Sequence, residues 1–171
     1  LGLVGGVGSG KSFFSQALSS KYAVAIIDAD AIGHRVLQEP VVIEEIRQTF
    51  GPDVLLPSGQ VDRKKVGALV FGTVPEARQA RQQLEAIVHP RIMTHIQAQI
   101  AAAQSQPEFQ AVILDAAILL ETGWRNECDV IVFIDTPAAQ RLSRVEQSRG
   151  WTRAQWERRE ASQMPLELKR Q

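Results

Sequence analysis

The chain of 171 residues is long enough to form one α/β domain with a substantial hydrophobic core. Its 19 basic and 19 acidic residues give a formal net charge of zero, which argues against nucleic-acid binding and a polybasic membrane surface. The single cysteine cannot form an internal disulfide, and no apolar run reaches the ~18 residues of a membrane span. We therefore expect a cytoplasmic protein, a monomer or small homo-oligomer, without nucleic-acid or membrane partners.

The chain begins with an apolar run, residues 1–4, that predicts a short buried strand. We expect one or two residues of the natural start to precede it. Residues 5–12 match the phosphate-loop pattern G-x-x-x-x-G-K-[ST] at every fixed position, and apolar residues at helical spacing follow. A glycine-rich turn without function is the alternative. Strand, loop and helix in this order, however, supply the context that phosphate binding requires.

The residue types of this loop explain how it would bind phosphate. Glycines let the backbone turn with its N–H groups facing inward, and the helix adds its N-terminal amides and the positive end of its dipole. Lys11 is expected to reach the β- and γ-phosphates, and the Ser12 hydroxyl to bind Mg²⁺. We predict a nucleoside triphosphate site made by Gly6, Val7, Gly8, Ser9, Gly10, Lys11, Ser12 and Phe13.

Residues 24–27 form a second apolar run, which predicts a parallel strand that ends in Asp28-Ala29-Asp30. The carboxyl ends of parallel strands share one edge with the phosphate loop, so both carboxylates are expected near it. Asp28 either caps the following helix or supports the site, and the sequence leaves both interpretations open. We assign Asp30, just inside that helix, a catalytic or metal-linked role.

Helical patterns fill the long segment between Asp30 and the next predicted strand. Apolar stripes predict helices around residues 42–50, 66–70, 80–88 and 92–100, with Asp62 as a cap and Gly72 as a stop. A break is expected at His89-Pro90, because the residue before proline avoids helical geometry. A parallel crossover needs only one helix, so we interpret the segment as an inserted subdomain that holds the phosphoryl acceptor.

Several charged residues of this insert allow two interpretations. Arg63 and the lysines after it could form a solvated helix face or hold an anionic group of the acceptor. His89 could line the site or belong to the core. By residue type alone, His34 and His95 fit a structural role better than a functional one.

Two further strands are predicted at residues 112–115 and 130–134. The first ends in an acid, like a Walker-B strand, and should deliver Asp115 to the edge that holds the phosphate loop. From residue 140 onward, arginines crowd a helix–Gly150–helix segment. This segment is either a solvated surface hairpin or a mobile lid, and we favour a lid whose guanidinium groups reach the transferred phosphoryl group.

Together these motifs resemble the dephospho-CoA kinase family. The matching pieces are the phosphate loop of residues 5–12, Asp28-Ala29-Asp30, His89-Pro90, Leu119-Leu120-Glu121, and Gln163-Met164-Pro165 with Lys169. The resemblance implies transfer of a phosphoryl group from ATP, with Mg²⁺, to the 3′-hydroxyl of the ribose of dephospho-CoA, giving CoA and ADP. Asp30 matches the acid that the family is thought to use as general base.

The expected fold is α/β, a P-loop, nucleoside-monophosphate-kinase-like parallel sheet with helices on both faces, plus a helical acceptor-binding insert and a lid. Its parts would be a nucleotide-binding core of residues 1–34 and 105–139, an acceptor subdomain of residues 35–104, and a lid of residues 140–165. Besides the phosphate loop, the predicted site comprises Asp30, Lys11 and Arg144 as catalytic residues, Arg149 as an ATP contact, Asp30, His34, Arg63, His89 and Leu119 as substrate contacts, and Ser12 with Asp115 as metal contacts.

The chain departs from the family pattern in places. Phe13 replaces a small hydroxyl residue, Ala117 replaces a proline, and Arg144 and Arg149 are five positions apart where four is usual. The family also continues into another strand and helix, which we expect to be missing after residue 171. The alternatives are another P-loop small-molecule or nucleotide kinase and a non-catalytic nucleotide-binding module. A GTPase would carry an N-K-x-D motif, which this sequence lacks.

Overall fold

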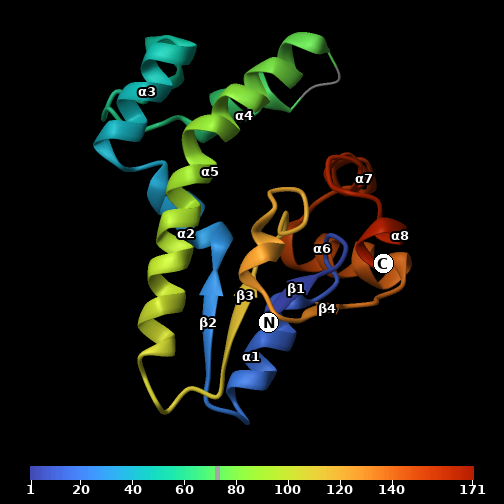
Figure 1. Ribbon diagram of the computed structural model, residues 1–171. Coiled ribbons are helices and arrows are strands. Elements are labelled where there is room, and N and C mark those ends of the chain that lie inside the picture. Colours follow the sequence, from blue (N-terminus) through green and yellow to red (C-terminus); the bar gives the residue numbers. More distant parts are fainter. Residues whose placement is uncertain (72–73) are drawn as a thin grey trace. The chain divides into compact units, whose positions relative to one another are not determined.

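The computed structural model describes residues 1–71 and 74–171, which form two compact units (Figure 1). One unit contains residues 1–30 and 97–171, and the other contains residues 31–96. The predicted stop at Gly72 lies outside the described residues. Within the described ranges, none of the helices combines the length and the apolar character that crossing a membrane requires.

A parallel sheet with the strand order β2-β3-β1-β4 forms the centre of the first unit. Its strands are β1 (Gly2–Val4), β2 (Val24–Asp28), β3 (Ala111–Asp115) and β4 (Ile131–Phe133). All neighbouring pairs run parallel, so the carboxyl ends of the strands meet at one edge. Leu3, Ile113 and Leu114 on the inner strands are at most 2% exposed. The predicted α/β class with a parallel sheet is confirmed.

The order of the strands explains which of them are buried. The run at residues 130–134 is strongly hydrophobic, yet the side chains of β4 are only half-buried, because β4 lies at an edge of the described sheet. At the other edge, Ile26 of β2 is 37% exposed. Asp28 is itself part of β2 and pairs in register with Asp115 of β3. The backbone of Asp28 therefore lies at the carboxyl-terminal end of the strands, the end at which the phosphate loop begins.

Helices connect and follow these strands. Helix α1 (Lys11–Ser19) follows β1 and contacts β2 and β3. The 3-10 helix η2 (Trp124–Glu127) precedes β4, and α6 (Ala138–Arg149), α7 (Arg153–Ala161) and α8 (Leu166–Lys169) follow it. Gly150, with φ +64°, ends α6, and a capping box of Thr152 and Gln155 starts α7. The predicted helix–Gly150–helix arrangement is confirmed.

The arginine-rich α6 and α7 have a small apolar core of their own, which the sequence analysis did not anticipate. Leu142, Val145 and Trp156 form a buried cluster with Val7 of the phosphate loop, and Trp151 packs against it. The two helices are therefore attached to the loop by apolar burial as well as by charge.

The second unit is helical, as the insert prediction required. It contains most of α2 (Ala29–Val36), α3 (Pro40–Phe50), the 3-10 helix η1 (Pro52–Val54), α4 (Arg63–Val70) and most of α5 (Pro75–Gln104). Asp62 caps α4 as predicted, since its Oδ1 accepts hydrogen bonds from the amides of Lys64 and Lys65 at 3.0 and 3.2 Å. Val42, Ile46 and Ile96 are fully buried.

The predicted helix break at His89-Pro90 is wrong. Helix α5 runs without interruption from Pro75 to Gln104, with Pro90 inside it. Proline removes one helical hydrogen bond, and its ring crowds the preceding turn. In that turn the Arg91 guanidinium donates to the Ile87 carbonyl at 2.9 Å. The neighbouring Val88 and Ile92 are at most 9% exposed, so burial of this face stabilises the continuous helix against the local preference.

Candidate active site

The loop between β1 and α1 has the tight turns that its glycines allow. Gly8 has φ +82° and Gly10 has φ +92°, a region that residues with side chains rarely adopt. A Cβ atom on Gly8 would lie only 2.6 Å from the carbonyl oxygen of Arg141, so this position also has no room for a side chain. The Ser9 amide donates to the Gly6 carbonyl at 3.1 Å and closes the turn.

The carbonyl of Ser9 is held from outside the loop. It accepts hydrogen bonds from Thr136 Oγ1 at 2.9 Å and from Arg144 Nη1 at 3.0 Å. In a trans peptide the N–H points opposite to the C=O, so these bonds turn the amide of Gly10 away from Thr136 and Arg144. The Ser9 hydroxyl is buried and has no hydrogen-bond partner among the described residues. A bound ligand or water commonly satisfies such an atom.

Lys11, the first residue of α1, folds back over the loop and donates to the Gly5 carbonyl at 3.4 Å. Burial lowers the pKa of its ammonium group below the usual 10.5, while the carboxylates of Asp115 and Asp30 act in the opposite direction. Asp30 and Asp115 therefore lie close enough to act on the charge of Lys11. The structure brings together the lysine and the two acids that the sequence proposed for the site.

Ser12 and Asp115 are joined directly, because Ser12 Oγ donates to Asp115 Oδ2 at 2.7 Å. Asp115 is 9% exposed at the carboxyl end of β3. A hydroxyl and a carboxylate are oxygen donors of the kind that Mg²⁺ takes, together with phosphate oxygens and water. Residues 1–71 and 74–171 contain no cluster of three or more His, Cys, Asp or Glu side chains suited to a metal ion. The pair therefore fits Mg²⁺ bound mainly through a nucleotide.

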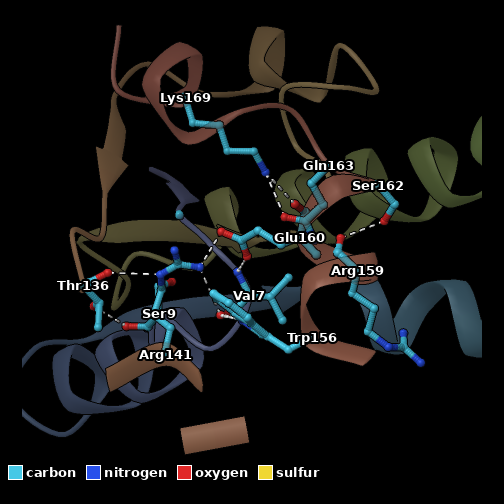
Figure 2. A network of polar contacts seen from close by, with 12 residues as sticks. Val7, Ser9, Thr136, Arg141, Trp156, Arg159, Glu160, Ser162, Gln163 and Lys169 are labelled. Carbon is cyan, nitrogen blue, oxygen red and sulfur yellow. Dashed lines mark hydrogen bonds and ion pairs between the residues drawn. The ribbon is translucent and has the colours of Figure 1, made fainter. Parts of the chain in front are cut away.

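A buried ion pair lies at the same unit's C-terminal helix α8. Lys169 is 4% exposed, and its Nζ lies 2.9 Å from Glu121 Oε1. The same Nζ lies 3.1 Å from Gln163 Oε1 (Figure 2). Glu121 also accepts a hydrogen bond from the Met164 amide at 2.7 Å. These residues belong to motifs of the family resemblance, but no role could be predicted for them. Lys169 is near enough to Lys11 that its positive charge also lowers the pKa of Lys11.

Arg141 was not among the site residues predicted from the sequence. It is 4% exposed, forms an ion pair with Glu160 of α7, and donates through Nε to the Thr136 carbonyl at 3.1 Å (Figure 2). Arg149, predicted as an ATP contact, lies over the ring of Trp151 at 4.8 Å from its centroid, and Arg159 lies over the same ring at 4.2 Å. The available sequence signal was the pair of tryptophans further along the segment, Trp151 and Trp156, which indicates apolar burial there.

The predicted substrate contacts of the helical unit include one joined pair. His34 Nε2 lies 2.8 Å from Arg63 Nη2, and both residues are exposed. His89 is half-buried in α5, and burial lowers the pKa of its imidazole. In the other unit, Leu119 is 1% exposed and packs next to Gly2, so a contact with substrate would have to come from its backbone. His95 forms a pair with Glu39 at 2.8 Å, in line with a structural role.

These features define a P-loop nucleotide-binding protein of the kinase type: a parallel sheet, a glycine-rich phosphate loop that leads into a helix, and an acid on the neighbouring strand. A family model described as dephospho-CoA kinase matches residues 1–171. The chain is 38% identical to the dephospho-CoA kinase of Albidiferax ferrireducens over 167 residues, which are 95% of this chain and 75% of that protein. It is 36% identical to the dephospho-CoA kinase of Thermobifida fusca over 171 residues, 99% of this chain and 82% of that protein.

Among solved structures, TT1252 from Thermus thermophilus is similar with a TM-score of 0.80 and 32% identity, over 99% of this chain and 82% of that chain. The chain belongs to the dephospho-CoA kinase family. The sequence-based assignment to this family is confirmed.

Proposed function

We propose that this protein transfers the γ-phosphoryl group of ATP to the 3′-hydroxyl of the ribose of dephospho-CoA. In the reaction, a bond forms between the 3′-oxygen and the γ-phosphorus, and the bond from that phosphorus to the β,γ-bridging oxygen breaks. The products are CoA and ADP. The observation that carries the proposal is the convergence of Lys11, Asp30 and the Ser12–Asp115 pair beside a phosphate loop, in a chain of this family.

The phosphate loop would bind the triphosphate through its backbone amides and through Lys11. Lys11 is partly buried, and the developing charge on the phosphoryl oxygens would be stabilised more strongly by its ammonium group there than in water. Arg144 already contacts the loop at the Ser9 carbonyl, so a change of its side-chain conformation would bring a guanidinium group to the phosphates. We assign residues 140–165 as the lid and residues 35–104 as the acceptor subdomain.

The Ser12 hydroxyl and the Asp115 carboxylate would hold Mg²⁺. When bound, this ion neutralises phosphate charge and helps to orient the γ-phosphoryl group. Both side chains are already oriented by their mutual hydrogen bond.

Asp30 would orient the acceptor hydroxyl and take its proton. A ribose hydroxyl is a poor nucleophile, so a carboxylate within hydrogen-bond distance supports the attack on phosphorus. Asp30 lies in the first turn of α2 at the sheet edge, and its negative charge is felt by Lys11. Arg63 with His34, His89, and the backbone of Leu119 would contribute to binding of dephospho-CoA.

A coupled assay of ADP release, with Mg-ATP and with or without dephospho-CoA, tests this proposal. It would be run on the wild type, on Asp30→Asn, and on Asp129→Asn, whose exposed carboxylate precedes β4 at the opposite end of the sheet. We expect ADP release to depend on dephospho-CoA, to fall by about 100-fold or more in Asp30→Asn, and to persist in Asp129→Asn. ATP binding without any dependence on dephospho-CoA would instead favour another kinase or a binding module.

A further inference from the structure

Val7, in the middle of the phosphate loop, has both of its backbone polar groups bound by side chains of α7. Its amide donates to Glu160 Oε2 at 2.9 Å, and its carbonyl accepts from Trp156 Nε1 at 3.1 Å (Figure 2). Two peptide groups meet at Val7, one shared with Gly6 and one shared with Gly8. Glu160 therefore helps to hold the first peptide group, whose Gly6 carbonyl also accepts from the Ser9 amide. Trp156 helps to hold the second, whose carbonyl also lies 3.5 Å from Arg141 Nη1.

The orientation of these peptides decides what the loop offers to a ligand. In a trans peptide the N–H points opposite to the C=O. With the Val7 carbonyl held by Trp156, the amide of Gly8 points away from α7. Neither Gly6 nor Gly8 has a side chain that could restrict the backbone, and Gly8 sits at φ +82°. Within the loop, the Ser9 amide restrains the first of these peptides through the Gly6 carbonyl, and side chains from outside the loop restrain both.

Glu160 and Trp156, which together form a clamp on Val7, are themselves held by Arg141. Glu160 uses its other carboxylate oxygen to pair with Arg141, whose side chain is 5% exposed. The Arg141 guanidinium also lies over the ring of Trp156, 5.1 Å from its centroid, and donates to the Thr136 carbonyl. Because Arg141 neutralises Glu160, the carboxylate can sit beside the phosphate loop without acting as an unpaired negative charge.

We propose that Glu160 and Trp156 are positioning residues for ATP, which orient the two peptides around Val7 so that the loop presents the Gly8 amide to the phosphates. The proposal rests on the phosphate-binding role of the loop given under the proposed function. In this role the two side chains act on ATP through the backbone of Val7. Helix α7 thereby contributes to nucleotide affinity.

Four variants separate the positioning role from a role in folding. Glu160→Gln keeps an oxygen that can accept from the Val7 amide, whereas Glu160→Leu removes the acceptor and leaves Arg141 without its carboxylate. The double variant Arg141→Leu/Glu160→Leu removes that unpaired charge as well. Trp156→Phe keeps an aromatic ring but loses the N–H donor. Glu157→Gln, on an exposed position of the same helix, is the matched control.

The readouts are the dissociation constant for ATP from calorimetric titration, the KM for dephospho-CoA, and the Tm. We expect Glu160→Leu to weaken ATP binding by about tenfold or more, Trp156→Phe by about threefold to tenfold, and Glu160→Gln by no more than about threefold. The KM for dephospho-CoA should not change. The double variant should recover Tm relative to Glu160→Leu but should not recover ATP affinity.

Several results would overturn the proposal. If the double variant regains both Tm and ATP affinity, the clamp serves folding only. If Glu160→Leu binds ATP more tightly than the wild type, Glu160 obstructs the phosphate site. Equal ATP affinity in all variants would reject the positioning role while leaving the proposed function intact. Failure of the wild type to bind ATP would reject both.

Discussion

Ser12 and Asp115, 103 positions apart in the sequence, are joined by a hydrogen bond of 2.7 Å. Ser12 lies in the first turn of α1, and Asp115 is the last residue of β3. The bond therefore fixes the two oxygen atoms before any ligand arrives. A site preorganised in this way should bind a metal–nucleotide complex with little rearrangement.

Replacement of Asp115 by Asn should reduce activity mainly through the metal. We expect a loss of about 10- to 100-fold at a fixed Mg²⁺ concentration, since the amide is a weaker ligand than the carboxylate. Raising the Mg²⁺ concentration should restore part of the activity, which a titration of rate against Mg²⁺ would measure. An unchanged Mg²⁺ dependence would remove Asp115 from the metal site.

Lys11 should make the free energy of unfolding of the nucleotide-free protein depend on pH. Burial lowers its pKa in the folded state below the usual 10.5, so the unfolded chain holds this proton more tightly. The contribution of Lys11 to the free energy of unfolding should therefore rise with pH between the lowered pKa and 10.5. The difference between wild type and Lys11→Met in chemical denaturation, followed from pH 7 to 10.5, measures this contribution.

At pH 7, Lys11→Met should be at least as stable as the wild type without nucleotide, because folding no longer buries the charge. Its activity should fall by about 100-fold or more, and ATP should no longer raise its Tm. Lys21→Met, at an exposed position, is the control and should keep the ATP-dependent rise in Tm. A nucleotide-free Lys11→Met protein that is clearly less stable would contradict this account.

The ion pair of Lys169 and Glu121 should contribute strongly to stability. Their side chains are 2% and 19% exposed, so Lys169→Met leaves a largely buried carboxylate without its cation. We expect a loss of about 3 kcal/mol in the free energy of unfolding, which corresponds to a Tm lower by roughly 6–12 °C in calorimetry. Lys64→Met, on an exposed face of α4, should change Tm little. If the double variant Glu121→Gln/Lys169→Met is destabilised as much as Lys169→Met alone, the broken ion pair is not the cause of the loss.

Gly8 and Gly59 offer a matched test of the phosphate loop, because both have φ +82°. Around Gly59 a Cβ would meet no atom within 4 Å, whereas at Gly8 it would lie 2.6 Å from the Arg141 carbonyl oxygen. Gly59→Ala should cost about 1 kcal/mol from backbone strain alone. Gly8→Ala should cost clearly more in denaturant unfolding and should also weaken ATP binding. Equal losses in the two variants would show that Arg141 moves away without cost.

Most of the fold could be predicted from the sequence because its signals are local. Short apolar runs predicted the strands, and the phosphate-loop pattern predicted the connection from β1 into α1. The continuous helix α5 could not be predicted in this way. The rule for the residue before Pro90 is local, while burial of Val88 and Ile92 on a packed face is tertiary and outweighs it.

The site was predicted in part for the same reason. Lys11, Ser12 and Asp115 belong to recognisable motifs at the ends of strands, so their meeting followed from the parallel sheet. The contacts of Glu160 and Trp156 with Val7 were missed because the arginine-rich segment that contains these residues was interpreted as a solvated hairpin or a mobile lid. Charge patterns do not reveal burial, and only Trp151 and Trp156 indicated that this segment contains a core.

The pairing of Arg141 with Glu160 also has an evolutionary consequence. For folding, a buried guanidinium without its carboxylate is strongly unfavourable, and so is a carboxylate that has lost its guanidinium, whereas loss of both charges together is tolerated by the fold. Single substitutions at either position should therefore be disfavoured by selection. Among members of the family, we expect the two positions to change together: a relative should carry both charges or replace both.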